Sequence, residues 1–399
     1  MPVTGSGGGA RRTRQMTHAL GPFQAGMVSA GRNAEIRELT PVDLGFPDSG
    51  TLHYYNDRDG QLKYWSTFDL TAGGVKSGKT PAFGKIPAMF KTGKGDRYWS
   101  PAHREKVNRL SALSTEWSRM FDLSELELAF VDDPVYFLPL TEGLKKQAVP
   151  VVVISHNIES LASHQVNRRC RQRLFNREIE ILAACDLVIT ISREETWLLK
   201  NLDIHALYFP YYPVDDIRNR LLTIRKSREK TEKRDFLLIG TTINEATRQG
   251  MVAVINHWKR QKLFVAGDRL LVAGFMSDVF LKEIKNEKHI DVLGPLTDEE
   301  LDRISGRVRA SIVYQDFGSG ALTRIMETLI AGVPILINSH AARSYHNMSG
   351  LVEIDGLQGL SGAFREIEKV EGRIPLPSRP DSDFLIAEIQ RIMERRNRL

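Results

Sequence analysis

Cysteine is scarce in this sequence: the 399 residues include only Cys170 and Cys185. Two cysteines exclude a disulfide framework, and their spacing excludes a structural zinc site. The sequence also lacks an apolar run of about 18 residues, the length that crosses a membrane, and its N-terminus has no signal-peptide core. We therefore expect a soluble protein of the reducing cytoplasm.

A large charge imbalance is absent as well. Lysine and arginine total 55 and aspartate and glutamate total 49, so the net charge is +6 and the pI is near 9.2. This small excess does not indicate nucleic-acid binding, but it suits an anionic ligand or a lipid surface. With 42% hydrophobic and 26% charged residues the composition is globular, and the length predicts two or three domains.

Short β-branched runs alternate with helical patterns from residue 147 onward, which predicts an α/β fold of βαβ units around parallel sheets. The run from Val151 to Ile154 has no polar interruption, as expected of a strand covered on both faces. Further strands are expected at 186–191, 236–239, 270–273, 312–314 and 334–337. Helices are expected at 10–20, 166–184, 245–258, 298–305 and 321–331. Thr297 and Glu300 form a capping box before the fourth of these helices.

A break in composition divides the chain. Within residues 210–234, two tyrosines and a proline lead into a charged stretch without apolar residues, which we interpret as a linker. This assigns residues 1–209 to an N-terminal domain and 235–375 to a C-terminal domain. Residues 376–399 are assigned to a tail and helix that packs back on the N-terminal domain. Residues near 57–98, rich in glycine, lysine and aromatics, have no clear period and are interpreted as an irregular insertion.

One segment matches the P-loop of ATPases: Gly73 is followed by Gly78, Lys79 and Thr80. A P-loop opens a helix whose N-terminal N–H groups hold phosphate, whereas prolines and a glycine directly follow Thr80. The apolar run that ends at Asp132 resembles the accompanying magnesium-binding strand, but carboxylates at strand ends are common. A P-loop ATPase is the least favoured interpretation.

A more coherent candidate site consists of Gly318, Ser319, Gly320, Arg324 and Glu327. The glycines lie between an expected strand and helix, where exposed N–H groups and the helix dipole favour an anion. Arg324 lies one turn into that helix and can reach the same anion, and Glu327 lies on roughly the same face. A carboxylate there could accept hydrogen bonds from both hydroxyls of a ribose. A surface Arg–Glu pair on an ordinary loop is the structural alternative.

This segment, continued by Ala-Gly-Val-Pro at 331–334, resembles the donor-site motif of retaining glycosyltransferases of family 4, which have the GT-B fold. Other stretches agree with the family in order and spacing: 155–157, Glu178, 191–192, 236–240 with Asn244, and 294–301. The resemblance covers most of residues 150 to 370. It implies two Rossmann-like domains facing across a cleft, with the nucleotide sugar on the C-terminal domain and the acceptor on the N-terminal one.

The resemblance also implies roles for single residues. Glu327 would bind the nucleotide ribose, Arg324 would lie near the diphosphate, and His156 would lie near the donor sugar. Further donor-site positions are Gly240, Thr241 and Thr242 after the first strand of the donor domain, together with Gly318, Ser319 and Gly320. Gly7, Gly8 and Gly9 look like the family's flexible glycine loop, which closes toward the leaving phosphate. The family generally needs no metal or cofactor, and we expect none here.

His156 has a structural alternative, because a histidine at a strand end often bonds a backbone carbonyl. Its place after a buried strand, where open α/β sheets bind ligands, favours a site residue. The site also departs from the family at two places. Ser319 stands where the family has an acidic residue, and Thr241 and Thr242 stand where it has Arg and Lys, with Arg248 as a loose substitute.

The predicted function is sugar transfer from a nucleoside diphosphate to a hydroxyl of a glycan, a lipid-linked or a small-molecule acceptor. A catalytically silent GT-B protein that binds only a nucleotide or a partner is the alternative. Two basic clusters fit either solvated surface or peripheral contact with the inner face of a membrane, and nucleic acid is not expected as a partner. These clusters are the arginines between 168 and 177 and the lysines between 76 and 94.

Overall fold

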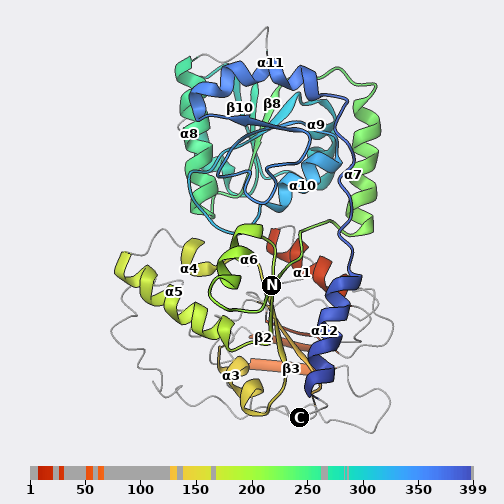
Figure 1. The fold of residues 1–399 in the computed structure, drawn as a ribbon. Coiled ribbons are helices and arrows are strands. Elements are labelled where there is room, and N and C mark those ends of the chain that lie inside the picture. Colours follow the sequence, from red (N-terminus) through yellow and green to blue (C-terminus); the bar gives the residue numbers. More distant parts are fainter. Residues whose placement is uncertain are drawn as a thin grey trace.

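The computed structural model describes residues 8–20, 27–30, 51–56, 62–66, 126–132, 138–162, 168–261, 268–282, 284 and 287–396. In this structure two α/β bodies lie one above the other, each built on its own sheet (Figure 1). The N-terminal body is the lower one in Figure 1, and the C-terminal body, with helix α11 at its far side, is the upper one. No helix among the described residues is long and apolar enough to cross a membrane.

The N-terminal domain has a four-stranded parallel sheet in the order β4-β5-β6-β7. Its strands are β4 (Ala129–Asp132), β5 (Val151–Ser155), β6 (Leu187–Thr190) and β7 (Ala206–Tyr208). All five residues of β5 are buried, which confirms the expectation of a strand covered on both faces. The helices that accompany the sheet are α1 (Gly8–Ala19), α3 (Leu138–Lys146), α4 (Glu159–Ala162), α5 (Arg168–Ala183) and α6 (Arg193–Lys200).

A second sheet lies earlier in this half of the chain. It joins β1 (Met27–Ala30) in parallel to β2 (Thr51–Asn56), and β2 in antiparallel to β3 (Leu62–Ser66). Strand β3 lies inside the segment 57–98, so part of the expected irregular insertion is one arm of a hairpin. The strand is only five residues long, too short for a period to be recognised in the sequence.

The C-terminal domain has a six-stranded parallel sheet in the order β10-β9-β8-β11-β12-β13. Its strands are β8 (Phe236–Ile239), β9 (Leu270–Ala273), β10 (Ile290–Gly294), β11 (Ala310–Val313), β12 (Ile335–Asn338) and β13 (Leu351–Ile354). Its helices are α8 (Glu245–Gln261), α9 (Asp298–Arg307), α10 (Thr323–Ile330) and α11 (Leu360–Val370), with short 3-10 turns at Ser277–Lys282 and Leu357–Gly359. The capping box of Thr297 and Glu300 is present at the start of α9. This strand order reverses direction between β8 and β11, as in doubly wound nucleotide-binding folds.

The stretch interpreted as a linker instead contains α7 (Asp215–Arg228), which packs against α9 and α10. Leu221 and Ile224 belong to the apolar core of the C-terminal domain. Arg225 and Arg228, part of the charged stretch, are directed inward and donate to backbone carbonyls of that domain. Because these arginines donate to carbonyls of the domain, their charges do not indicate an exposed segment.

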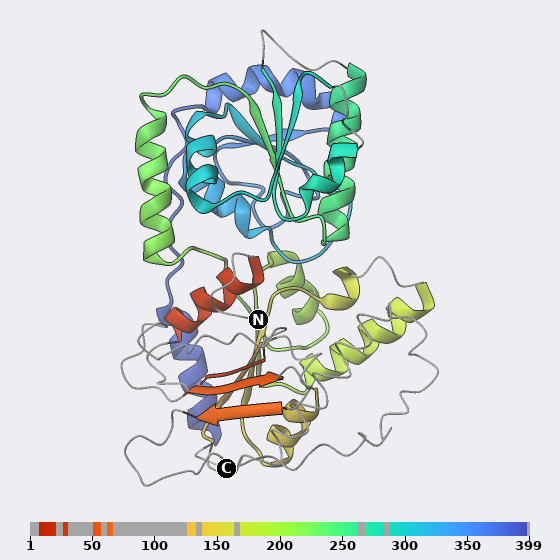
Figure 2. The same ribbon diagram turned by 180° about the vertical axis from the view of Figure 1, so that it is seen from behind.

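The C-terminal helix α12 (Asp383–Arg396) returns to the N-terminal domain. Its residues Leu385, Ile389 and Ile392 pack with α1 and with the buried face of β5 and β6. Figure 2 shows α1 in red at the junction of the two bodies and α12 in blue beside it. The chain therefore passes between the domains twice, once before α7 and once before α12.

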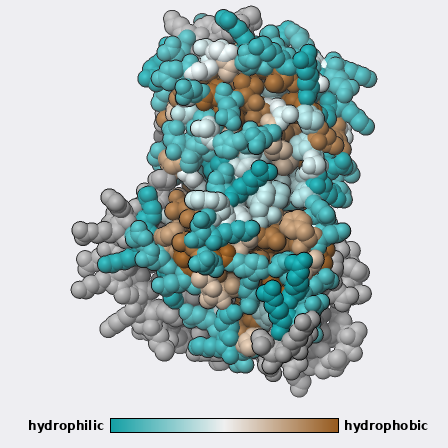
Figure 3. All heavy atoms as spheres, in the orientation of Figure 1, coloured by the Kyte–Doolittle hydropathy of each residue, from teal (hydrophilic) through white to brown (hydrophobic). Residues whose placement is uncertain are grey.

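The surface at the junction is polar on one side of the molecule. In Figure 3, teal and white residues predominate between the two bodies, with brown patches mainly above and below them. Hydrophilic residues therefore cover most of the exposed surface of the junction on this face.

Candidate functional site

The candidate site begins where β8 and β11 end, at the point where the strand order of the C-terminal sheet reverses. Ligands of open α/β sheets bind outside the carboxyl ends of the strands at this point. Gly240 follows β8, and the turn 318–320 lies between β11 and α10. Two segments predicted from the sequence as donor-binding are therefore neighbours in the fold.

Gly240 makes a close approach that requires glycine. Its N–H donates to the carbonyl of Ala273 at 3.1 Å. A Cβ at this position would lie 2.3 Å from Thr247 Cγ2 and 2.8 Å from a guanidinium nitrogen of Arg324. The absent side chain thus makes room for Arg324 at the end of β8.

Thr241 and Thr242 replace the basic residues that the family has after this strand. Thr241 is exposed, whereas Thr242 is buried and donates through its hydroxyl to the carbonyl of Met276 at 2.9 Å. Neither side chain carries a charge, so this turn supplies no cation to a bound diphosphate. Arg248 pairs with Glu245 on the same helix at 2.6 Å.

The turn 318–320 touches the other domain. Gly318 and Gly320 have φ values of 118° and 70°, which favour glycine. A Cβ on Gly320 would lie 2.7 Å from the backbone oxygen of His156. Ser319 donates through its hydroxyl to the carbonyl of Ile158 at 3.2 Å. The structure therefore brings the turn 318–320 and the His156 loop into contact although they lie far apart in sequence.

Arg343, which was not predicted from the sequence, forms hydrogen bonds with the backbone of this turn. Its guanidinium donates to the carbonyls of Gly320 at 2.7 Å and Ser319 at 3.0 Å. It also bonds the side-chain oxygen of Gln315 at 3.2 Å. These hydrogen bonds to a charged guanidinium fix the conformation of the turn 318–320.

Arg324 is a cation of the site that forms no ion pair with the residues that the structure describes. It is partly buried, and it donates to the carbonyl of Ile239 at 2.9 Å. Its Nε is shielded from solvent and has no hydrogen-bond partner in the described part of the chain. Burial, followed by the nearby charge of Arg343, lowers the pKa of the Arg324 guanidinium to about 10. Arg324 therefore remains charged at neutral pH and lacks a counterion among the described residues.

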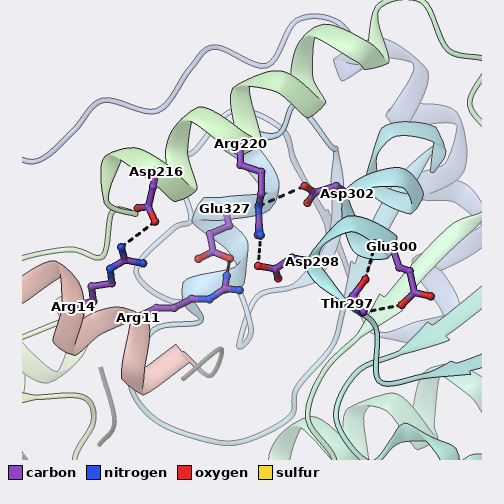
Figure 4. A network of polar contacts seen from close by, with 9 residues as sticks. All are labelled: Arg11, Arg14, Asp216, Arg220, Thr297, Asp298, Glu300, Asp302 and Glu327. Carbon is purple, nitrogen blue, oxygen red and sulfur yellow. Dashed lines mark hydrogen bonds and ion pairs between the residues drawn. The ribbon is translucent and has the colours of Figure 1, made fainter. Parts of the chain in front are cut away.

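Glu327 is 8% exposed, and both of its carboxylate oxygens have partners, of which Figure 4 draws Arg11. Oε1 accepts a hydrogen bond of 2.6 Å from the hydroxyl of Tyr211, and Oε2 forms an ion pair with Arg11. Although burial lowers it, the charge and hydrogen bond of Glu327 raise the pKa of Arg11 above its ordinary value. Neither partner was predicted from the sequence, because Arg11 and Tyr211 lie 316 and 116 residues away.

His156 is bonded to a carboxylate of the neighbouring strand. Its Nε2 lies 2.6 Å from Oδ1 of Asp132, whose Oδ2 accepts a bond of 2.8 Å from the hydroxyl of Thr13 on α1. Burial raises the pKa of Asp132, but the charge and hydrogen bond of His156 hold it below its ordinary value. The Nε2 of His156 is thus bonded to a carboxylate and not to a backbone carbonyl. Asp132 was noticed in the sequence, but as a strand-end carboxylate of the magnesium-binding kind.

The glycine loop is described only in part. Gly8 and Gly9 form the start of α1, two residues earlier than the helix expected from the sequence, and Gly7 lies outside the described residues. The P-loop match at 73–80 also lies outside them. Within the described ranges, no group of three or more His, Cys, Asp or Glu residues could hold a metal ion.

Glu195 on α6 joins the two loops that meet at the junction. It is 4% exposed, and its Oε1 accepts the N–H of Ile158 and the N–H of Gly320, both at 2.9 Å. Burial raises the pKa of this carboxyl to about 7, despite these two hydrogen bonds. The next residue toward the N-terminus, Glu194, accepts the N–H of Ser344 from the C-terminal domain at 2.7 Å.

We expect Glu195 to make the stability of the protein depend on pH. Because the pKa of Glu195 is about 7 in the folded protein, above the ordinary 4.5 of a glutamate, the folded form holds the proton more tightly than the unfolded form. The free energy of unfolding should therefore decrease as the pH rises from about 5 to 8, by roughly 1–3 kcal/mol from this group. Urea unfolding at both pH values should show that Glu195→Gln removes this decrease.

Glu194→Gln is the matched control for this experiment. Against the effect of burial, hydrogen bonds led by that of Ser344 lower the pKa of Glu194. Its contribution is thus present at pH 8 and lost in acid, opposite in sign to that of Glu195. An unchanged pH dependence in Glu195→Gln would contradict the assignment of a protonated carboxyl at the junction.

The sequence matches no protein-family model and no curated protein. Solved structures, however, resemble the fold over nearly the whole chain. HepE of Anabaena, solved in complex with UDP and glucose, has 12% identity and a TM-score of 0.58, covering 99% of this chain and 97% of that one. Sucrose-phosphate synthase of Thermosynechococcus elongatus has 14% identity and a TM-score of 0.54, covering 98% and 89%.

A third similar structure is TarM, a protein of S. aureus, with 10% identity and a TM-score of 0.51. The match covers 71% of this chain and 58% of TarM, so the chain spans little more than half the length of that protein. At these identities the likenesses establish the fold. The expected α/β architecture of two Rossmann-like domains, the GT-B fold, is confirmed.

Proposed function

We propose that the protein is a metal-independent, retaining glycosyltransferase of the family 4 type. It moves a sugar from a nucleoside diphosphate to a hydroxyl of a glycan, lipid-linked or small-molecule acceptor. Similarity to GT-B glycosyltransferases supports glycosyl transfer in general. The HepE structures contain UDP, UDP with glucose, or UDP-glucose, so a UDP-linked sugar is the first donor to test.

The observation that carries this proposal is the charge on Arg324. A partly buried guanidinium without a counterion, next to a helix N-terminus, suits a diphosphate better than a neutral ligand. The first turn of α10 contains no acidic residue, and its N-cap, Leu322, makes no side-chain cap. The N–H groups of this turn and Arg324 would together stabilise the negative charge that develops on the departing diphosphate.

Glu327 would accept hydrogen bonds from the ribose hydroxyls, and His156 would orient the donor sugar. Asp132 fixes the orientation of the His156 ring by its bond to Nε2. The contact of Gly320 with the His156 backbone supports a shared ligand, because the diphosphate end and the sugar end of a donor are only a few bonds apart.

The acceptor would bind on the N-terminal domain. Among the basic clusters, the described part of α5 includes Arg177, which pairs with Glu142 and Glu180, both at 3.2 Å. These ion pairs favour a solvated helix face over contact with anionic lipid. A lipid-linked acceptor would then reach the site without α5 lying on the membrane.

A direct test is to incubate the protein with UDP-glucose and other nucleotide sugars and to measure the release of nucleoside diphosphate. We expect release by slow donor hydrolysis or by transfer to an added acceptor. The anomeric configuration of the product, read by NMR, tests the retaining mechanism. Absence of nucleotide binding throughout the panel would contradict the proposal.

A catalytically silent nucleotide-binding protein is the second candidate. It is favoured by Glu327, whose oxygens are bonded to Arg11 and Tyr211, and by the uncharged Thr241 and Thr242. Ser319, in the place of an acidic residue, bonds the other domain rather than facing a sugar. Tight nucleotide binding without hydrolysis or transfer would identify this case.

A further inference from the structure

Arg11 places a cation of the N-terminal domain at the carboxylate that we assign to the ribose. It lies in the first turns of α1, and its guanidinium forms an ion pair with Glu327 on α10 (Figure 4). The side chains of Arg11 and Glu327 are 15% and 11% exposed. Arg11 thus already lies inside the candidate donor site, although it comes from the opposite domain.

The position of Arg11 in its helix is unfavourable without an anion. The first turn of α1 contains no acidic residue, and positive side chains near a helix N-terminus oppose the helix dipole. Arg11 therefore depends on negative charge from the other domain. At present Glu327 supplies it, and Asp298 at the start of α9 adds a weaker attraction.

The donor site itself offers a diphosphate little positive charge. A nucleoside diphosphate brings two or more negative charges, whereas Thr241 and Thr242 are neutral and Arg324 is one cation. Arg324 lies three residues before Glu327, so the diphosphate and ribose positions are about one helical turn, or roughly 5 Å, apart. The guanidinium of Arg11 can cross this distance by rotation of its own side chain.

We propose that Arg11 is a donor-binding residue. It pairs with Glu327 before the nucleotide binds, and it moves to the diphosphate when the ribose hydroxyls take its place on Glu327. This inference rests on the proposed function and adds a cation supplied across the cleft in place of the basic pair missing after β8.

Titration calorimetry with UDP and with uridine tests this role. Uridine has the ribose without the phosphates, so the two ligands separate the contacts of Arg11 from those of Glu327. In Arg11→Ala we expect UDP to bind about 10- to 100-fold more weakly, as for a lost charge-assisted hydrogen bond. Uridine should bind as tightly as in the wild type or more tightly, since its competitor for Glu327 is gone.

Arg14→Ala is the matched control. Arg14 lies on the same helix and also joins the two domains, through an ion pair of 2.9 Å with Asp216 (Figure 4). The Arg14→Ala variant should have unchanged affinities for UDP and uridine. The affinity of Arg11→Lys for UDP should lie between those of Arg11→Ala and the wild type. Arg11→Gln gives the same comparison if Arg11→Ala does not fold.

Three results would overturn the inference: an equal loss of UDP and uridine binding, unchanged UDP binding, or tighter binding of both ligands. The first two would make Arg11 structural, and the third would make it only a competitor for Glu327. A wild-type protein that binds none of UDP, ADP and GDP would instead contradict the proposed function, and with it the role of Arg11.

Discussion

Replacing His156 by alanine should lower the turnover of sugar transfer by a factor of about 100 or more while leaving nucleoside diphosphate affinity unchanged. His156 belongs to the N-terminal domain, whereas Arg324 and Glu327, which would bind the nucleotide, belong to α10 of the C-terminal domain. A group that acts mainly on the reacting sugar affects the rate rather than binding of the nucleotide. The measurement is the transfer rate beside nucleotide affinity in the same variant.

Asp132→Asn provides a control that keeps the size of the side chain. It removes the negative charge that faces His156 Nε2. Both the pH dependence of the turnover and the maximal turnover should therefore change. Circular dichroism and the melting temperature should show that both variants remain folded. Full turnover in His156→Ala, or unfolding of that variant, would make the histidine structural.

Replacing Glu327 by glutamine should weaken the affinity for UDP by about 1–3 kcal/mol, the scale of a charge-assisted hydrogen bond. Unlike a surface carboxylate, this group also stabilises the junction of the domains. Its loss leaves Arg11 without its ion pair in a largely buried position, so the melting temperature should fall too. Glutamine can still accept the bond from Tyr211, which limits this fall relative to alanine.

The two effects can be separated with a modified ligand. The 2′,3′-dideoxy form of UDP lacks the hydroxyls that would face Glu327. The wild type should bind this ligand more weakly than UDP, whereas Glu327→Gln should bind the two ligands with equal affinity. The two proteins and two ligands together form the equivalent of a double-mutant cycle. An equal preference for UDP in the wild type and the variant would place the ribose elsewhere.

Most elements of the C-terminal domain could be predicted from the sequence. The runs at 236–239 and 270–273 became β8 and β9 with the expected bounds, because short apolar strands in a parallel sheet are buried on both faces. The capping box predicted the start of α9 in the same way, from two residues that interact locally. Local sequence patterns were sufficient to predict a helix or strand wherever the contacts that define it lie within that element.

Helix α7 was missed for the opposite reason. Its arginines satisfy carbonyls of distant segments, such as Gly332 and Ile374, and charged residues are normally evidence of exposure. The partners of Glu327 could not be predicted either, because no local pattern connects Arg11 or Tyr211 to α10. The sequence therefore indicated which residues could bind a nucleotide, but not that Glu327 is bonded to Arg11 of the other domain.

A crystal structure of the protein grown with UDP would show directly whether a nucleotide binds between the domains on α10. We expect density for the ribose against Glu327, for the diphosphate at Arg324 and the turn 318–320, and for Arg11 turned from Glu327 toward the phosphates. Density for UDP at the segment 73–80, or an ion pair of Arg11 and Glu327 that persists with UDP bound elsewhere, would contradict the account.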